Sequence, residues 1–412
     1  MLLPMIHSGR RIPLTDLRQG MFVADVFNDN DVLLYSARTL ITSDQQIESL
    51  KNQGVSSVCI VSDEPAFEQE ETRIEEPNER LMPSGESILE YAHYQQQLKT
   101  AGIIHEQALG AIEEAMSAVK MGRMFQSREV VRSTERLVEQ VVLDPDLYFG
   151  LMQIRSIGNY LYSHSVNVGI MTAAFAGALN YSPDKILDIA VGGMLHDIGK
   201  IKLPESIWLK NENCSRKEYE SFKLHPAFGI DIVDGNGRKL PEFTRAIIGH
   251  HHERWNGGGY PAGLSGEAIH ETALMCALTD VYDLLTSRTP YHAGCIPQEA
   301  LARIFQRADD EYPRPLVEQF ARLLGIYPVG SFISLKSGEK GLVIRTNRLT
   351  LLAPVVVILI DGHGRHLEKP FVRDLSKGST HPADVQRYKI ECSLDPAGYG
   401  IFPSRYFKTV AA

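Results

Sequence analysis

The chain has 412 residues, of which 43% are hydrophobic and 23% are charged, values that are ordinary for a globular protein able to bury a sizeable core. Lys and Arg total 42 against 51 Asp and Glu, and the resulting net charge of −9 argues against a DNA-binding protein, which would need a basic face. A small anionic ligand is not excluded, because one local cluster of basic residues can outweigh the average charge.

The apolar runs and the cysteines indicate the cellular compartment of the protein. The longest apolar run, 351–360, contains a proline and is well short of the roughly 20 residues that a membrane-spanning helix needs. Five cysteines lie far apart with no CxxC pair, which is typical neither of a disulfide framework nor of a thiolate zinc site. Residues 1–11 lack the pattern of a secretory signal. We therefore expect a cytoplasmic protein with no membrane span.

Residues 1–62 predict a small α+β domain. Two β-rich runs, 21–27 and 55–61, flank a helix whose start is marked by the capping-box pair Ser43 and Gln46 and whose end is marked by Gly54. Residues 63–83 then predict a linker, because this stretch is rich in acidic residues and prolines, which favour an extended chain. We expect a packing or regulatory role for residues 1–62, and for the linker an extended, solvated segment with acidic docking as the alternative.

The rest of the chain predicts helices followed by strands. Spaced apolar positions with few breakers predict a helical connecting segment at 84–144 and an all-α catalytic domain at 145–325. Ser182–Pro183, and Ser215 with Glu218, mark two helix starts. From 326 to 412 the pattern changes to strands and hairpin turns. The expected fold class is mainly α, with a helical domain between a small α+β domain and a small β-rich domain.

Candidate metal ligands occur at five places in the helical region. His164 and Asp280 lie on the apolar faces of predicted helices, where either residue alone would more often be a satisfied core or ion-paired side chain. Imidazole and carboxylate groups suit first-row divalent metals such as iron, manganese and zinc. The set is large enough for two metals that share one carboxylate, and it comprises His164, His196, Asp197, His225, His251, His252 and Asp280.

The order of these motifs resembles the HD-GYP family, a branch of the HD metal phosphohydrolases. The matching segments are HDIGK at 196–200, HP at 225–226, HHERWNGGGYPAGLSGE at 251–267 and DVYDLLTS at 280–287. RIPLTDLRQGMFV at 11–23 is similar to the small domain often found before HD-GYP domains, and YPVGSFISL at 327–335 to their β-rich tail. The resemblance implies an HD-type helical fold. It also implies hydrolysis of cyclic di-GMP, a bacterial second messenger, to pGpG and onward to GMP through a metal-bridging hydroxide.

The resemblance also implies roles for individual residues. One divalent ion, iron or manganese, would be held by His164, His196, Asp197 and Asp280, and a second by Asp197, His225, His251 and His252. Asp197 and Lys200 would be catalytic, although a solvated loop lysine is the alternative for Lys200. The substrate-binding residues would be Lys200, Gly259, Tyr260, Pro261 and Arg288. A shifted assignment, with His250 and His251 as the pair of ligands, stays open.

Two departures from the family pattern affect the expected ligand. Tyr160 stands where some relatives carry a glutamate ligand, which predicts two metals and not three. In TSRTPYH at 286–292, Thr289 occupies the usual arginine position, Arg288 comes one residue early and His292 replaces a basic residue. A lost arginine–phosphate contact would cost about 2 kcal/mol. Another cyclic dinucleotide such as cyclic GMP-AMP, or a low-turnover receptor or adaptor, therefore stays open. Protein partners at the GYP loop or terminal domains, and a homodimer, also stay open.

Overall fold

The computed structural model divides the chain into two compact units, Met1–Arg80 and Leu81–Ala412, and each is described by itself. The residues that it describes are 10–18, 22–23, 26–27, 33–35, 39–40, 47–48, 50–51, 55, 57–61, 85–124, 127–154, 160–208, 215–235, 240–287, 294–377 and 387–407. None of the helices in these ranges is both long enough and apolar enough to cross a membrane.

The first unit contains a four-stranded antiparallel sheet. Its strand order is β1 (Arg10–Pro13), β6 (Ser57–Val61), β2 (Phe22–Val23) and β5 (Thr39–Leu40), and β3 (Val26–Phe27) pairs separately with β4 (Leu33–Tyr35). A 3-10 turn, η1 (Leu14–Asp16), follows β1, and Leu14, Leu17 and Leu50 are buried. Strands thus form in both predicted β-rich runs. The predicted cap at Ser43 and Gln46, Gly54 and the linker at 63–83 lie outside the described residues.

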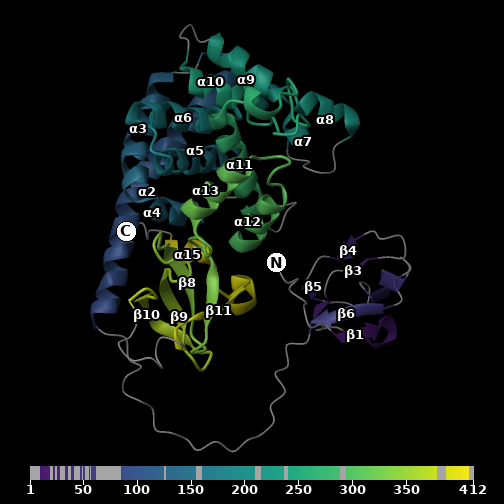
Figure 1. Ribbon diagram of the computed structural model, residues 1–412, viewed down its shortest axis with the longest axis vertical. Helices are drawn as coiled ribbons and strands as arrows, with labels where there is room; N and C mark the ends of the chain where they lie inside the picture. The colour runs from purple at the N-terminus through teal and green to yellow at the C-terminus, as the bar shows by residue number, and fades with distance from the viewer. Residues whose placement is uncertain are drawn as a thin grey trace, which may run out of the picture. The chain divides into compact units, whose positions relative to one another are not determined.

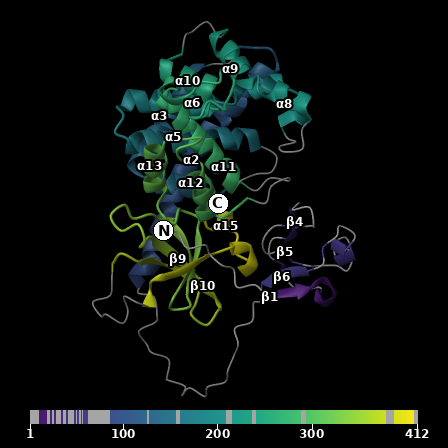
Figure 2. The same cartoon turned by 45° about the vertical axis from the view of Figure 1, so that its right-hand side comes forward.

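The second unit begins with a long helical region (Figures 1 and 2). Its helices are α2 (Gly85–Lys120), α3 (Ser127–Leu143), α4 (Pro145–Leu151), α5 (Tyr160–Ala178), α6 (Pro183–Leu195), η4 (Ile198–Lys202), α7 (Glu205–Trp208), α8 (Arg216–Phe222), α9 (His225–Asp234), α10 (Glu242–His250), η6 (Gly266–Ala268), α11 (Glu271–Thr286), α12 (Pro297–Gln306) and α13 (Arg314–Leu324). Helix α5 is central, because every side chain from His164 to Ala176 is buried. The mainly α fold class expected from the sequence is confirmed.

The predicted helix starts agree with the structure in different degrees. Helix α6 starts after Ser182 with Pro183 in its first turn, but the Ser182 side chain makes no capping hydrogen bond. Helix α8 has the complete predicted capping box, in which the Ser215 hydroxyl accepts from the Glu218 amide and the Glu218 carboxylate accepts from the Ser215 amide.

A five-stranded antiparallel sheet follows the helices. Its order is β10 (His366–Asp374), β9 (Val355–Ile360), β8 (Lys340–Arg345), β7 (Phe332–Leu335) and β11 (Ile390–Leu394), and the short elements η7 (Pro396–Tyr399) and α15 (Pro403–Phe407) come after it. One face of the sheet shares its core with the helices, and the other buries a second apolar cluster. Helix α2 packs against both α3 and β10 (Figure 1). The segments predicted as separate domains from residue 84 onward therefore lie in one compact unit, and their exact boundaries stay predictions.

Candidate metal centre

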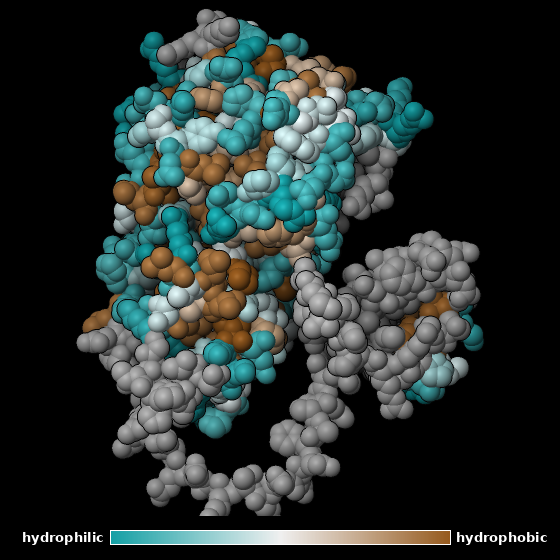
Figure 3. All heavy atoms as spheres, in the orientation of Figure 1, coloured by the Kyte–Doolittle hydropathy of each residue, from teal (hydrophilic) through white to brown (hydrophobic). Residues whose placement is uncertain are grey.

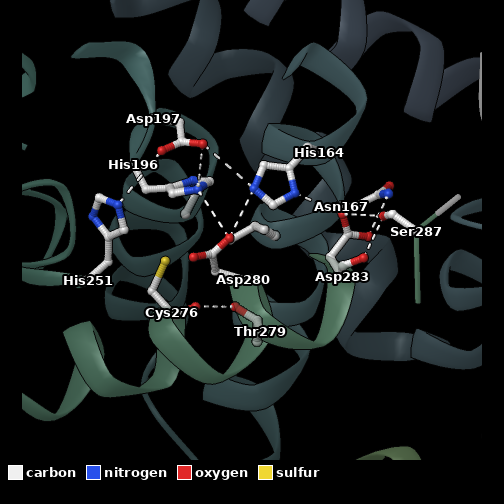
Figure 4. Close-up of polar contacts among 12 residues, drawn as sticks. His164, Asn167, His196, Asp197, His251, Cys276, Thr279, Asp280, Asp283 and Ser287 are labelled. Carbon is white, nitrogen blue, oxygen red and sulfur yellow. Dashed lines mark hydrogen bonds and ion pairs between the residues drawn. The ribbon is translucent and has the colours of Figure 1, made fainter. Parts of the chain in front are cut away.

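Three helices bring the first group of candidate ligands together. His164 comes from α5, His196 follows the last residue of α6, and Asp280 comes from α11 (Figure 4). Helices α5 and α6 approach closely because two glycines face each other: a Cβ on Gly193 would lie 3.0 Å from the Gly169 Cα. His164 Nε2 is 3.1 Å from Asp280 Oδ1. The ligand atoms of His164, His196 and Asp280 all lie within 4.8 Å of one another, close enough to hold one ion.

Asp197 connects this group to a second one. Its Oδ2 is 3.3 Å from His196 Nε2 and 3.7 Å from His164 Nε2. Its Oδ1 is 3.4 Å from His225 Nε2 and 3.8 Å from His251 Nε2. The second set of ligand atoms within 4.8 Å of one another comes from Asp197, His225, His251 and His252. One carboxylate thus offers a different oxygen to each group.

His250 differs from its neighbours. It is the last residue of α10, and within the described part of the chain it belongs to neither group. His251 and His252 both join the second group. The geometry therefore favours these two over the shifted pair of His250 and His251.

The donor atoms fit divalent metal ions. The Nδ1 atoms of His196, His225 and His251 lie 2.7, 2.8 and 3.0 Å from the carbonyl oxygens of Gly193, Phe222 and Ile247. Because a carbonyl oxygen can only accept, each Nδ1 carries the proton and each Nε2 turns a lone pair toward the centre. His196 Nε2, Asp197 Oδ1 and His252 Nε2 are buried and have no hydrogen-bond partner among the described residues. Such atoms are costly unless a ligand satisfies them, and metal ions would do so.

Burial and neighbouring charges set the protonation states of the candidate ligands. Burial alone would raise the pKa of Asp197, but His196 and Lys200 hold it well below its usual range. The pKa of Asp280 is likewise lowered, because His164 outweighs the effect of burial. Burial lowers the pKa values of His225 and His252 well below the usual range. Burial disfavours the charged form of His164, but Asp280 and Asp283 outweigh it and raise its pKa to about 10. The centre therefore presents ionised carboxylates and, at His225 and His252, neutral imidazoles, whereas a metal ion would have to displace a proton from His164.

Two of the predicted substrate-binding residues, Lys200 and Tyr260, contact members of the second group. Lys200 Nζ lies 2.5 Å from Asp197 Oδ2, and its side chain is only 15% exposed. The ring of Tyr260 stacks on that of His252 with their centroids 4.7 Å apart. Gly259 and Pro261 flank Tyr260, and the Tyr260 amide donates to the His252 carbonyl oxygen. Arg288, with Thr289 and His292, lies outside the described residues.

Asp283 is a site residue that the sequence analysis missed. It is fully buried, and its Oδ2 lies 2.8 Å from His164 Nδ1 while its Oδ1 accepts from the Asn167 side chain at 3.0 Å (Figure 4). The carboxylate thereby holds the His164 ring with Nε2 toward the centre. Its position one helical turn after Asp280, on a helix with a buried face, was the available signal.

Replacing Asp283 with alanine is expected to weaken metal binding and hydrolysis about 10- to 100-fold, the usual effect of removing a group that orients a metal-binding histidine. Asp283→Asn keeps an acceptor for His164 and should lose less. Metal titration followed by turnover measurements would test this. Asp231→Ala, which removes an exposed carboxylate on α9, is the control. An Asp283→Ala variant with unchanged metal affinity would contradict the orienting role.

Glu253 is a second missed residue, and it anchors the loop that carries Tyr260. Its side chain is fully buried. Oε1 accepts from the Ala262 amide at 2.7 Å and Oε2 accepts from the Leu264 amide at 2.9 Å. The only signal in the sequence was an acidic residue directly after the histidine pair.

We expect Glu253→Gln to loosen this loop. A glutamine offers one carbonyl oxygen, so its amide group must face one of the two N–H donors and leave it unsatisfied, at a cost of about 1–3 kcal/mol. Hydrogen exchange at the Ala262 and Leu264 amides should become faster. Glu267→Gln, at an exposed position of the same loop, is the matched control. Unchanged exchange at both amides would show that Glu253 does not anchor the loop.

Comparisons with known proteins agree with this architecture. Residues 153–316 match the family model of the HD domain, and residues 10–130 match that of a domain of unknown function, DUF3391. A cyclic di-GMP phosphodiesterase of Pseudomonas aeruginosa is 28% identical over 360 residues, which are 86% of each chain. A cyclic di-GMP phosphodiesterase of Thermotoga maritima is 32% identical over 162 residues, 39% of this chain and 44% of its own.

The chain is also similar to one further curated relative and to one solved structure. A 3'3'-cGAMP-specific phosphodiesterase of Vibrio cholerae is 29% identical over 124 residues, 30% of this chain and 24% of its own. A solved structure of an HDG"Y"P protein from Bdellovibrio bacteriovorus covers 76% of this chain and 99% of its own, with 18% identity and a TM-score of 0.47.

The fold and the ligand set define an HD domain protein, in which a helical core holds clustered histidines and aspartates. Within that class, the chain resembles the HD-GYP cyclic di-GMP phosphodiesterases, and its N-terminal part matches the DUF3391 model. The family resemblance expected from the sequence is thereby confirmed.

Proposed function

We propose that this protein is a metal-dependent phosphodiesterase that hydrolyses cyclic di-GMP to pGpG, with GMP as the alternative end product. The observation that carries the proposal is Asp197, a buried carboxylate whose two oxygens face two separate groups of ligand atoms. The names of the relatives in P. aeruginosa and T. maritima support the choice of substrate.

In this proposal His164, His196, Asp197 and Asp280 hold one ion, and Asp197, His225, His251 and His252 hold the other. Nitrogen and oxygen ligands without thiolate make iron or manganese our choice. When bound, two such ions neutralise the charge of the phosphodiester and lower the pKa of water toward neutrality.

The chain's own residues bind the substrate and move the proton. A pGpG product requires that the bond between phosphorus and the 3′ oxygen breaks and that the oxygen of water joins the phosphorus. Lys200 Nζ lies at the centre, where it can bind a phosphate oxygen or protonate the leaving 3′ oxygen. Gly259, Tyr260 and Pro261 line the substrate in this proposal, and the Tyr260 ring stacks on His252. Gly259 allows this loop to pack closely, because a Cβ there would lie 2.4 Å from the Glu253 Cα. We also assign Arg288 to substrate binding, on its sequence position alone.

The direct test uses protein purified without oxygen and loaded with Fe(II) or Mn(II). It is incubated with cyclic di-GMP and, separately, with cyclic GMP-AMP, and the nucleotides are resolved over time. Formation of pGpG or GMP faster than cleavage of cyclic GMP-AMP supports the proposal. A preference for cyclic GMP-AMP would move the function to the class of the V. cholerae relative. Two bound metals and tight binding without product would identify a receptor or adaptor.

A cytoplasmic location is also part of the proposal. Cys276, Cys295 and Cys392 are free thiols, which suits a reducing cytoplasm. Protein partners at the loop around Tyr260 or at the terminal domains, and a homodimer, also remain proposals. Affinity capture and a measurement of molecular mass in solution would test them.

Removing the metals is expected to lower thermal stability as well as activity. A ligand at one hundred times its dissociation constant stabilises the folded state by about 2.7 kcal/mol, so stripping both sites should lower the melting temperature clearly. The measurement is thermal unfolding before chelation, after chelation and after Mn(II) is added back. The Asp197→Ala variant should show a smaller shift. Identical melting curves with and without chelator would contradict a structural contribution of the metals.

A further inference from the structure

Helix α8 lies beside the candidate centre although it buries none of its own side chains. A helix of seven residues is not stable in water by itself and normally depends on a buried face. Here the complete capping box of Ser215 and Glu218 stabilises the first turn. The exposed side chains of α8 are therefore available for a role other than packing.

The last residue of α8 is tied to the second ligand group. The Phe222 carbonyl oxygen accepts from His225 Nδ1 at 2.8 Å. The Phe222 ring centroid lies 4.9 Å from that of His225 and 6.3 Å from that of His252. Lys200 Nζ lies 5.3 Å from the same ring. The end of α8 is thus held against the centre.

Tyr219 and Lys223 extend this contact outward. They are four residues apart, and Tyr219 precedes Phe222 by three, so all three share one side of the helix. Tyr219 is 46% exposed, and Lys223 Nζ lies 5.3 Å from its ring centroid. Tyr219 and Lys223 thus extend outward from Phe222, the residue of α8 that contacts the second ligand group.

We propose that Tyr219 and Lys223 form a nucleotide-binding subsite on α8, in which the phenol ring stacks on a purine base and the ammonium group binds a phosphate. Every base has a face that stacks on an aromatic ring, and a lysine beside the ring provides the charge that a phosphate needs. Lys223 pairs with Glu220 at 2.9 Å in a partly exposed ion pair, which is weak enough to exchange for a phosphate. This inference rests on the proposed function and names residues that recognise its substrate.

The surface of α8 favours a nucleotide over a protein partner. The helix stands at the edge of the second unit in Figure 1, and its visible surface, at the upper right of Figure 3, is hydrophilic. A stable protein interface usually has an apolar core. The exposed Tyr219 ring beside the Lys223 ammonium group is instead suited to a base and its phosphate.

The test compares four variants on two substrates, cyclic di-GMP and bis(4-nitrophenyl) phosphate, a diester without a purine. Tyr219→Ala should raise KM for cyclic di-GMP at least tenfold. Its loss of kcat/KM should be at least tenfold larger for cyclic di-GMP than for the nitrophenyl diester. Tyr219→Phe keeps the ring and should restore most of the lost affinity. Lys223→Ala should raise KM, and Lys217→Ala, which removes an exposed lysine elsewhere on α8, is the control.

The outcomes separate this inference from the proposed function. Wild-type KM for cyclic di-GMP in Tyr219→Ala, or equal losses on both substrates, would overturn the subsite while leaving the phosphodiesterase in place. If the metal-loaded wild type does not cleave cyclic di-GMP, the proposed function fails, and the dissociation constant of cyclic di-GMP becomes the readout. Tyr219→Ala must then weaken binding at least tenfold. Absence of binding to the wild type would overturn the subsite as well.

Discussion

Alanine in place of Asp197 is expected to remove hydrolysis of cyclic di-GMP and to empty both candidate metal sites. The Asp197 side chain is buried, and its two oxygens lie within 3.3 to 3.8 Å of four imidazole nitrogens. Removing it takes a negative charge from both ligand groups at once and leaves Lys200 without its carboxylate partner. Losing several kcal/mol of transition-state stabilisation corresponds to a rate loss of about a thousandfold.

The measurement combines metal content per chain with turnover, and far-UV circular dichroism shows whether the variant is folded. Asp184→Ala, which removes an exposed carboxylate on α6, serves as the control. Asp197→Asn keeps the side-chain volume and separates loss of charge from loss of packing. A folded Asp197→Ala variant that retains two metals per chain would contradict the sharing of this carboxylate, whatever its activity.

The Gly199→Ala variant is expected to lose about 3 kcal/mol or more of stability, the upper range for inserting a methyl group into a packed core. A Cβ at this position would lie 1.9 Å from the His225 carbonyl oxygen and 2.6 Å from the Gly229 amide nitrogen. Both atoms belong to the backbone of α9, so no side chain can rotate away. The helix that carries His225 would have to move, and the second ligand group would be distorted with it.

Chemical denaturation and metal titration of the same variant would show the two effects together. Gly110→Ala is the matched control, because Gly110 lies in α2 and a Cβ there would meet nothing within 4 Å. In a helix interior that change should stabilise the protein by about 0.5–1 kcal/mol, the opposite sign. A Gly199→Ala variant as stable as the wild type would show that α9 is not packed tightly on η4.

The sequence was most informative where a residue's role depends on its near neighbours. The 3.6-residue period put His164 and Asp280 on buried helix faces, and the structure has both there. The pair Ser215 and Glu218 predicted a capping box that is present in full. At Ser182 the helix start was right, but the side chain makes no capping bond, since local pattern does not determine the rotamer.

The sequence did not predict contacts between residues that are far apart in the chain. Asp283 meets His164 across 119 positions of the chain, and only the packing of α11 against α5 creates that contact. The acidic residue after the histidine pair, Glu253, was visible in the sequence, but its two hydrogen bonds to amides of the following loop were not. The sharing of one core by the helices and the C-terminal sheet likewise depends on how both faces of the strands are covered.

The sequence by itself determined the mainly α class, the inventory of histidines and aspartates and their HD-GYP order, because these follow from residue type and short spacing. The family resemblance implied two ligand groups that share Asp197, but only the tertiary structure brings these ligand atoms together and α8 against the second group. Helices α5, α6, α9, α10 and α11 each contribute to the centre or end beside it, and their mutual distances are fixed by packing and not by any local rule.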